Sequence, residues 1–283
     1  MSGDRSAFRA RTPGPGSAVG WSGMSRLSPF TALLPAALMA IGGIATAGIS
    51  AAQEPGTPAP GVGTSDLSGR PVPGPSKARG THTALVLTST AVRRRPAGKA
   101  VIWRAKGETR WSGSVQRLMV LGSREAGGRT WLKVRLPIRP NGSAGWMPRN
   151  RVRLALSRRF ITIDLSRRLL RVYKRGRVLK RFKVVVGAPS TPTPRGLFAI
   201  YDRVRQPDPK GFTGPWVLPI TAHSEKLRKF DGGPGVVGLH GRGPASLGDP
   251  LGSARSHGCI RMDNSRIRYL SRLMVGTAVH IRR

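Results

Sequence analysis

One cysteine and two histidines carry the reactive groups near the C-terminal end of the sequence. Cys259 is the only cysteine among 283 residues, His257 precedes it by two positions, and His240 lies further upstream. A cysteine acts as a nucleophile in its thiolate form, which needs a nearby base or positive charge to lower its pKa from about 8.5. Gly258 lets backbone amides turn toward an oxygen that gains charge during acyl transfer. The pattern therefore indicates thiol-dependent acyl transfer.

Three other interpretations of these residues compete with catalysis. A single cysteine is often a small buried side chain, and a single histidine is often a surface or hydrogen-bonded core residue. His240, His257 and Cys259 also have ligand chemistry suited to zinc, but a glycine-rich stretch exposes a nucleophile better than it closes a metal shell. One cysteine excludes an internal disulfide and a cysteine-rich zinc site. We therefore expect neither a metal nor another cofactor.

Two separated motifs resemble those of the L,D-transpeptidase catalytic domain, the YkuD family. They are Leu239-His240-Gly241 and Ser256-His257-Gly258-Cys259-Ile260-Arg261-Met262. The runs 186–196 and 246–250 resemble that family's approach to its active site, and the likeness covers about residues 158–283. Both histidines precede the cysteine, whereas papain-like cell-wall endopeptidases place the cysteine first. The resemblance implies an enzyme that acts on peptidoglycan stem peptides.

The resemblance also implies a reaction and a role for the residues of both motifs. Cys259 would attack the carbonyl of the third residue of a stem tetrapeptide, release D-alanine and form a thioester. The amine of a neighbouring stem would resolve this thioester and give a 3→3 cross-link. His240 would be the general base, oriented by a backbone carbonyl near Gly241. The amides of residues 257–259 would stabilise the oxyanion, and Ser256 would support the loop.

Two arginines near the motifs are candidate substrate contacts, and a third only departs from the family pattern. Arg242 stands where relatives commonly have threonine, and Arg266 stands where an acidic residue is frequent. A guanidinium pairs well with carboxylates, so Arg242 is a candidate contact for a substrate carboxylate, with a solvated surface arginine as the alternative. Arg261 matches a common choice of the family and is a second candidate substrate-binding residue.

Short strands must position these residues. Ile161, Ile163 and Leu165 project to one face, and Leu170 and Val172 repeat the pattern after a hairpin turn. Further strands are predicted over 177–186, 196–201 and 278–282, with one short helix capped by Asp263 or Asn264 and carrying Ile267, Leu270 and Met274 on one side. The segment 157–283 is therefore predicted to be a mostly β, β-sandwich-like catalytic domain.

A second β domain is predicted over residues 81–156. Short apolar runs recur there between turn signals such as Ala97-Gly98 and Asn141-Gly142. The strand at Trp131 and the segment around Trp146 resemble bacterial SH3-like domains, which are often wall-associated. The two tryptophans are either core aromatics or part of a binding surface.

The N-terminal 80 residues contain three further segments. Residues 1–29 are basic, residues 30–52 are apolar for about the length that crosses a bilayer, and residues 53–80 are a linker rich in proline and glycine. The apolar segment is predicted to be a signal peptide or membrane anchor, so the rest would be extracytoplasmic, in the bacterial cell envelope. Pro35 and Gly42-Gly43 disfavour a buried core helix. Either Met1 or Met24 is the start.

A formal net charge of +37 predicts attraction to polyanions. Nucleic acid is not the expected partner, because no reading helix, zinc finger or aromatic sheet accompanies the basic residues. The arginines at positions 167, 171, 175 and 181 instead follow strand-like segments, as on a solvated surface. Steep salt-dependent binding to a DNA duplex would reverse this interpretation.

These observations predict an exported peptidoglycan L,D-transpeptidase that takes part in cell-wall biogenesis and cell shape. Carboxypeptidase action, in which water resolves the thioester, and attachment of a protein amine use the same thiol and remain alternatives. A non-catalytic wall-binding protein is the alternative from another class. Because β-lactams mimic stem peptides, we also expect a carbapenem to acylate Cys259.

Overall fold

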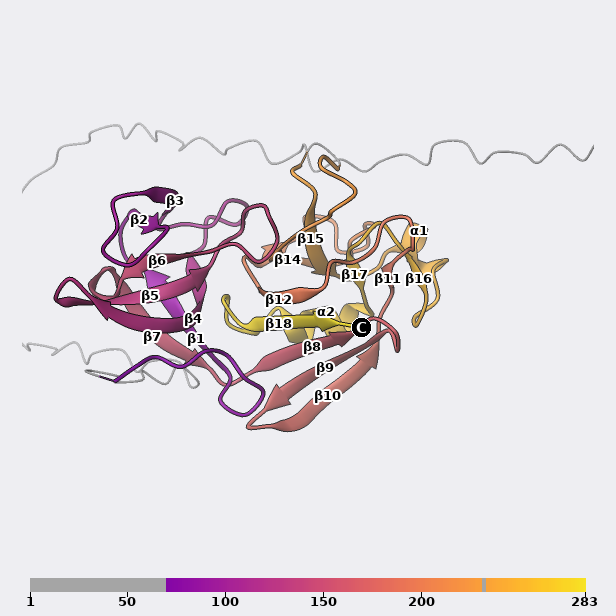
Figure 1. Cartoon of the computed structure of the whole chain (residues 1–283). Coiled ribbons are helices and arrows are strands. Elements are labelled where there is room, and N and C mark those ends of the chain that lie inside the picture. The colour runs from indigo at the N-terminus through magenta and orange to yellow at the C-terminus, as the bar shows by residue number, and fades with distance from the viewer. Residues whose placement is uncertain (1–69, 231–232) are drawn as a thin grey trace, which may run out of the picture.

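The computed structural model describes residues 70–230 and 233–283. The predictions for residues 1–29, for the apolar segment 30–52 and for most of the linker 53–80 lie outside these residues. Within the described ranges, no helix has the length and apolar character needed to cross a membrane. Two β parts lie side by side, the N-terminal one in indigo to magenta and the C-terminal one in pink, orange and yellow (Figure 1).

The N-terminal part is a seven-stranded antiparallel sheet with the strand order β3-β2-β6-β5-β4-β1-β7. Aliphatic side chains from its strands are fully buried against one another, among them Val92, Val120 and Leu132. The strands are β1 (Thr81–Val86), β2 (Thr90–Arg93), β3 (Val101–Ala105), β4 (Arg117–Ala126), β5 (Arg129–Arg135), β6 (Ala144–Pro148) and β7 (Val152–Ser157), with the 3-10 turn η2 (Arg149–Arg151) before β7. These side chains form a buried cluster separate from the main core of the C-terminal part, and the division into two domains stays a prediction.

The two tryptophans of this part have different environments. Trp131 is buried, and its indole nitrogen donates a hydrogen bond to the carbonyl of Ala126 at 3.0 Å. Trp146 is half-buried, and the ammonium of Lys133 lies 5.9 Å from the centre of its ring. Trp131 is therefore mainly a core aromatic, because only 4% of its surface is exposed.

The C-terminal part contains two larger sheets and one small one. A five-stranded sheet has the order β10-β9-β8-β18-β12, and a four-stranded sheet has the order β13-β14-β15-β17. The first contains β8 (Phe160–Asp164), β9 (Leu169–Lys174), β10 (Arg177–Lys183), β12 (Gly196–Ala199) and β18 (Ala278–Arg282). The second contains β13 (Val204–Arg205), β14 (Trp216–His223), β15 (Val236–His240) and β17 (Ile260–Arg261). The small sheet pairs β11 (Val186–Gly187) with β16 (Ala254–Ser256).

The main core of this part lies between the two larger sheets. Ile161 and Ile163 of β8 and Leu239 of β15 are fully buried in one cluster, and Leu165 packs against it from a partly buried position. The prediction that Ile161, Ile163 and Leu165 share a face toward the core is confirmed. Two facing sheets with one core give the mostly β, β-sandwich-like architecture that the sequence predicted.

Helix content is low, as predicted, but the helix ends differ. The helix α2 (Asn264–Leu270) buries Ile267 and Leu270 against the core and ends four residues before Met274. Met274 instead accepts a hydrogen bond from the hydroxyl of Thr83 in the N-terminal part, at 3.3 Å. Asp263 is the N-cap residue, but its side chain makes no capping hydrogen bond. The other helix, α1 (Pro244–Leu247), is one turn long.

Several hydrogen bonds join the two parts. The carboxylate of Asp202 accepts bonds from the amides of Trp111 and Ser112 at 3.2 and 3.1 Å. The side chain of Asn141 makes a reciprocal pair with the backbone of His223, with both bonds at 2.8 Å. These contacts link residues more than 80 positions apart, so they fix how the parts pack.

Candidate active site

Pairing of β15 with β17 brings the two sequence motifs together. The strands are parallel, with His240 opposite Arg261 and Leu239 opposite Ile260. Beyond the ladder, the Met262 amide donates to the carbonyl of His240 at 3.0 Å. Since β17 begins at Ile260, this register places Cys259 at the entrance of the strand next to β15. Two motifs that are separate in the sequence therefore form one site.

Cys259 has a partly exposed side chain beside β15. The amide of Gly238 donates a hydrogen bond to its sulfur at 3.4 Å. Burial raises the pKa of the Cys259 thiol, whereas the Gly238 amide and the positive charge of Arg261 act in the opposite direction. The net effect is a rise, so the resting group is a neutral thiol that needs a base to become a nucleophile.

His240 is buried and has a fixed tautomer. Its Nδ1 lies 2.8 Å from the carbonyl oxygen of Gly241. A carbonyl oxygen can only accept, so Nδ1 carries the proton and Nε2 keeps a lone pair. Burial lowers the pKa of His240 to about 4, and the positive charge of Arg261 acts in the same direction. At neutral pH the imidazole is therefore an uncharged group able to accept a proton.

The loop before the nucleophile is held by hydroxyl groups. Ser256 donates from Oγ to the carbonyl of Cys259 at 2.6 Å, and its Oγ accepts from the Gly258 amide at 3.1 Å. Thr193 donates to the carbonyl of Gly258 and accepts from the amide of Gly187, both at 2.8 Å. Gly258 has a φ of 114°, a backbone conformation that favours glycine. These bonds fix the direction in which Cys259 leaves the loop.

The predicted role of the Gly258 amide needs correction. This amide was expected to point at an oxyanion, but it already donates to Ser256. Gly258 supports the loop through its backbone conformation, and its amide is already engaged by Ser256.

His257 projects away from the core of the site. Its side chain is exposed, and its ring lies 5.6 Å from the ring of Phe230, measured between centroids. His240 contacts a different aromatic ring, that of Phe212, at 6.1 Å. The two histidines therefore have different surroundings, one at the surface and one in the interior.

The candidate arginines are engaged by carboxylates of the protein. Arg261 is 5% exposed, its Nη1 forms an ion pair with Asp249, and its guanidinium lies 4.9 Å from the Phe212 ring. The side chain of Arg242 is 11% exposed and bonds to Asp263 at 3.1 Å. Arg242 is thus not a solvated surface arginine, and its guanidinium also donates to the carbonyl of Asp249 at 2.9 Å.

Sequence reasoning gave no role to three residues that hold this site. Thr193 lies in the quoted run 186–196, and Asp249 lies in the run 246–250. Asn264 was considered only as a helix cap, yet its side-chain oxygen accepts from the Arg242 amide at 2.8 Å and its nitrogen donates to the Arg242 carbonyl at 3.0 Å. The resemblance of these two runs to the family pointed to the segments of Thr193 and Asp249. A single sequence does not reveal which distant residues their side chains contact.

In the ranges 70–230 and 233–283, no group of three or more histidine, cysteine, aspartate or glutamate side chains is placed to hold a metal ion.

The geometry can be compared with known proteins. Residues 158–281 match the YkuD family model, the L,D-transpeptidase catalytic domain. The candidate L,D-transpeptidase YkuD of Bacillus licheniformis is 36% identical over 123 residues, which are 43% of this chain and 64% of that protein. Its counterpart in Bacillus subtilis is 32% identical over 125 residues, 44% of this chain and 65% of that protein. The chain thus spans just under two thirds of the YkuD relatives that it matches.

A solved structure of an L,D-transpeptidase domain is also similar. The NMR structure of the catalytic domain from the E. faecium L,D-transpeptidase is 23% identical, covering 45% of this chain and 98% of that chain with a TM-score of 0.33. This TM-score is too low to show a shared fold. The similarity to the YkuD family therefore rests on the sequence match over residues 158–281.

Proposed function

We propose that the C-terminal part is a peptidoglycan L,D-transpeptidase that forms 3→3 cross-links through a thioester on Cys259. The observation that supports this proposal is the pairing of β15 with β17, which brings the two motifs onto neighbouring strands within the segment that matches the YkuD model. A neutral imidazole beside a neutral thiol suits a reaction that begins with proton transfer.

The first half of the reaction is acylation. Nε2 of His240 takes the thiol proton as sulfur bonds to the carbonyl carbon of the third residue of a donor stem. The carbon–nitrogen bond to D-alanine then breaks, and the proton passes from the imidazolium to the leaving amine. D-alanine leaves as the free amino acid, and the acyl group stays on sulfur as a thioester.

The second half is deacylation by an amine. The amine of the third residue of a neighbouring stem attacks the thioester carbonyl, giving a proton to His240, and the carbon–sulfur bond breaks. The proton returns to the departing thiolate and regenerates the neutral pair. Since the amide of Gly258 is engaged by Ser256, we assign the oxyanion to the Cys259 amide, and place His257 on the substrate side of the loop.

Arg261 tunes this neutral pair rather than binding substrate in our scheme. Its charge lowers the pKa of His240 and opposes the burial that raises the pKa of Cys259. Asp249 pairs with it and holds it in place. Arg242 is likewise assigned to positioning, because Asp263 occupies its guanidinium.

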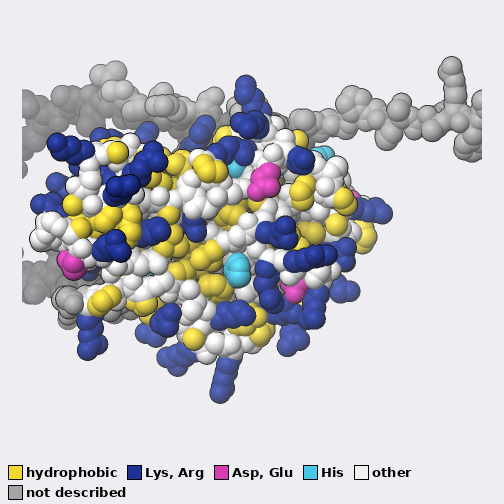
Figure 2. Space-filling view, viewed as in Figure 1, with side chains coloured by type: hydrophobic (Ala, Val, Ile, Leu, Met, Phe, Trp, Pro, Cys, Tyr) yellow, Lys and Arg dark blue, Asp and Glu magenta, His cyan; other side chains and the backbone are white. Residues whose placement is uncertain are grey.

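The setting we propose is the bacterial cell envelope. The apolar segment 30–52 would act as a signal peptide or a membrane anchor, and the N-terminal part would be an SH3-like module at the wall. Lys and Arg side chains are spread over the whole visible face of the molecule, with few acidic ones (Figure 2). Such a surface suits an envelope of anionic polymers.

Mass spectrometry tests the proposal on the full-length protein. Wild type is incubated with disaccharide-tetrapeptide muropeptides beside the variants Cys259→Ala, His240→Ala and, as a control, His280→Ala, which changes a histidine of β18 outside the site. We expect a dimer lacking one D-alanine from wild type and the control only. A tripeptide monomer in place of the dimer would indicate carboxypeptidase action. If wild type gives no dimer, no tripeptide and no acyl adduct, a catalytic role is refuted.

A further inference from the structure

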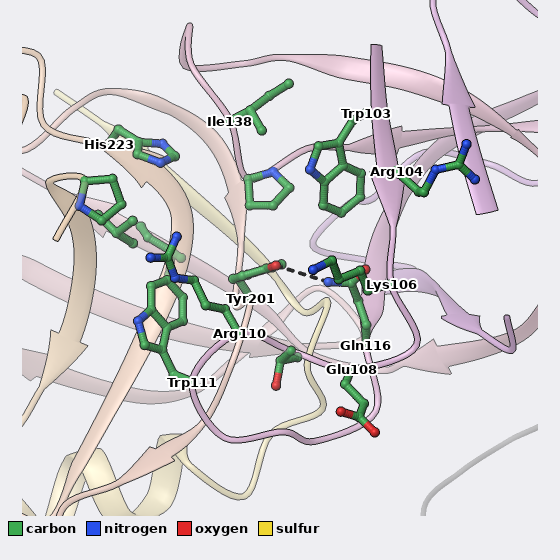
Figure 3. Close-up of a pocket in the computed structure, with 15 residues that line it drawn as sticks. Trp103, Arg104, Lys106, Glu108, Arg110, Trp111, Gln116, Ile138, Tyr201 and His223 are labelled. Atoms are coloured by element: carbon green, nitrogen blue, oxygen red, sulfur yellow. Dashed lines mark hydrogen bonds between the residues drawn. The ribbon is translucent and has the colours of Figure 1, made fainter. Parts of the chain in front are cut away.

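A cavity between the two parts lies outside the thiol site. Its volume is about 660 Å³, within the range of small-molecule sites. Trp103 of β3 and Trp111 of the following loop line it from the N-terminal part, while Tyr201, His223 and Val236 line it from the C-terminal part (Figure 3). The cavity therefore exists only because the two parts pack together.

Aromatic rings form opposite walls of this cavity. Figure 3 shows Trp103 and Trp111 on opposite sides, with Tyr201 between them. The rings of Trp111 and Tyr201 meet edge to face at 5.9 Å, and the Tyr201 hydroxyl accepts a hydrogen bond from Gln116 at 3.1 Å. Flat rings of this kind offer apolar contact area at little entropic cost. They fit the apolar face of a sugar ring as well as they fit a planar base.

The charged side chains at the cavity favour an anionic ligand. Arg104, Lys106 and Arg110 line it, against one carboxylate, that of Glu108. Burial lowers the pKa of His223 to about 4, with the charge of Arg139 acting in the same direction, so this histidine adds no positive charge at neutral pH. Three cations against one anion leave an excess suited to carboxylates.

The cavity lies close to the thiol site along β15, which favours a ligand that reaches both. Val236 lines the cavity, and two residues later the Gly238 amide bonds to the sulfur of Cys259. Two residues of a strand span about 7 Å. One covalent ligand with sugar rings at one end and a peptide at the other could therefore occupy the cavity and the thiol site together.

From these observations we propose that the cavity is a binding site for the carboxylate-bearing disaccharide of a muropeptide whose stem peptide lies at Cys259. This inference rests on the proposed function, because it takes the stem peptide as substrate. The walls are fixed before binding: Asp202 holds the Trp111 amide, and Asn141 holds the backbone of His223. Such preorganisation reduces the entropy lost when a ligand binds.

Calorimetry on the full-length Cys259→Ala protein tests the site without turnover. The probes are the disaccharide-tetrapeptide, the free tetrapeptide and a single-stranded oligonucleotide. We expect the disaccharide-tetrapeptide to bind about tenfold more tightly than the free tetrapeptide. Trp103→Ala should remove this advantage, whereas Trp146→Ala, which changes a half-buried tryptophan outside the cavity, should keep it.

A second cavity variant tests the site even if Trp103→Ala does not fold. Arg104 and Lys106 are exposed, so their joint replacement by glutamine leaves the core untouched. We expect it to weaken binding of the disaccharide-tetrapeptide several-fold and to leave the free tetrapeptide unchanged. Equal affinity for both muropeptide probes, or no effect of either cavity variant, would overturn the proposal, as would tighter binding of the oligonucleotide. If the disaccharide strengthens binding but the wild-type protein forms no thioester, the disaccharide site is supported and the proposed transpeptidase activity is refuted.

Discussion

Thr193 ties the backbone at Gly258 to strand β11 at Gly187, so its removal should loosen the loop before Cys259 without changing Cys259 or His240 themselves. Its hydroxyl donates to the carbonyl of Gly258 and accepts from the amide of Gly187, both at 2.8 Å, and the side chain is 4% exposed. Thr193→Val keeps the shape but leaves both backbone groups without this partner. The variant therefore isolates the contribution of two hydrogen bonds.

The cost can be worked from these contacts. A buried polar group left without a partner costs about 1–3 kcal/mol, and the Gly187 amide is only partly buried. We expect Thr193→Val to lower the free energy of unfolding by about 2–4 kcal/mol in total. Thr221→Val is the matched control, because the Thr221 hydroxyl accepts a single buried bond, from the Ala199 amide. Its expected cost is about 1–3 kcal/mol.

Two measurements on the full-length protein check this reasoning. Urea unfolding gives the free energy, and intact-mass kinetics with a carbapenem give the rate at which Cys259 is acylated. We expect Thr193→Val to slow acylation at least about tenfold, because Gly258 no longer holds its conformation. Thr193→Ser, which keeps the hydroxyl, should restore most of both quantities. Wild-type stability and wild-type acylation in Thr193→Val would refute the role assigned to this threonine.

Three further perturbations test other features. Gly258→Ala should cost about 1–3 kcal/mol of stability from its φ of 114°, which urea unfolding would detect; no loss would show that the backbone relaxes. The pKa of His240 is about 4 when folded and near 6.5 when unfolded, so stability should fall as pH drops through this window. His240→Ala should flatten that fall, and an unchanged slope would contradict the assignment. Asn141→Asp should loosen the contact with His223 by about 1–3 kcal/mol, while the exposed control Asn150→Asp should not; equal effects would argue against that contact.

Local patterns predicted the parts of the structure that depend on nearby residues. Alternation in 161–165 placed Ile161 and Ile163 in the core, because side chains of a strand alternate between its faces. The spacing of histidine, glycine and cysteine pointed to Cys259, with His240 and His257 as candidate bases, and the family resemblance assigned the role of general base to His240. In both cases the signal lies within a few residues of the group that it describes.

The remaining features depend on contacts between distant residues. Thr193 reaches Gly258 across 65 positions, and Asp202 reaches Ser112 across 90. The sequence predicted that the Gly258 amide faces an oxyanion and that the Arg242 guanidinium contacts a substrate carboxylate. In the structure the amide donates to Ser256 and the guanidinium donates to Asp263. The sequence also held no sign that Met274, which was expected on the helix, accepts a hydrogen bond from Thr83 of the N-terminal part.

The position of β18 sets a condition on how the site forms during synthesis. This strand lies between β8 and β12 in the five-stranded sheet and is parallel to β8, with Ile281 opposite Ile163. Until the ribosome has added residues 278–282, β8 and β12 have no shared neighbour, and the sheet that backs β15 and β17 is incomplete. Pairing over more than 100 positions is also slow, since the loop must close first. We expect a nascent chain to carry an unassembled, inactive thiol until synthesis passes β18.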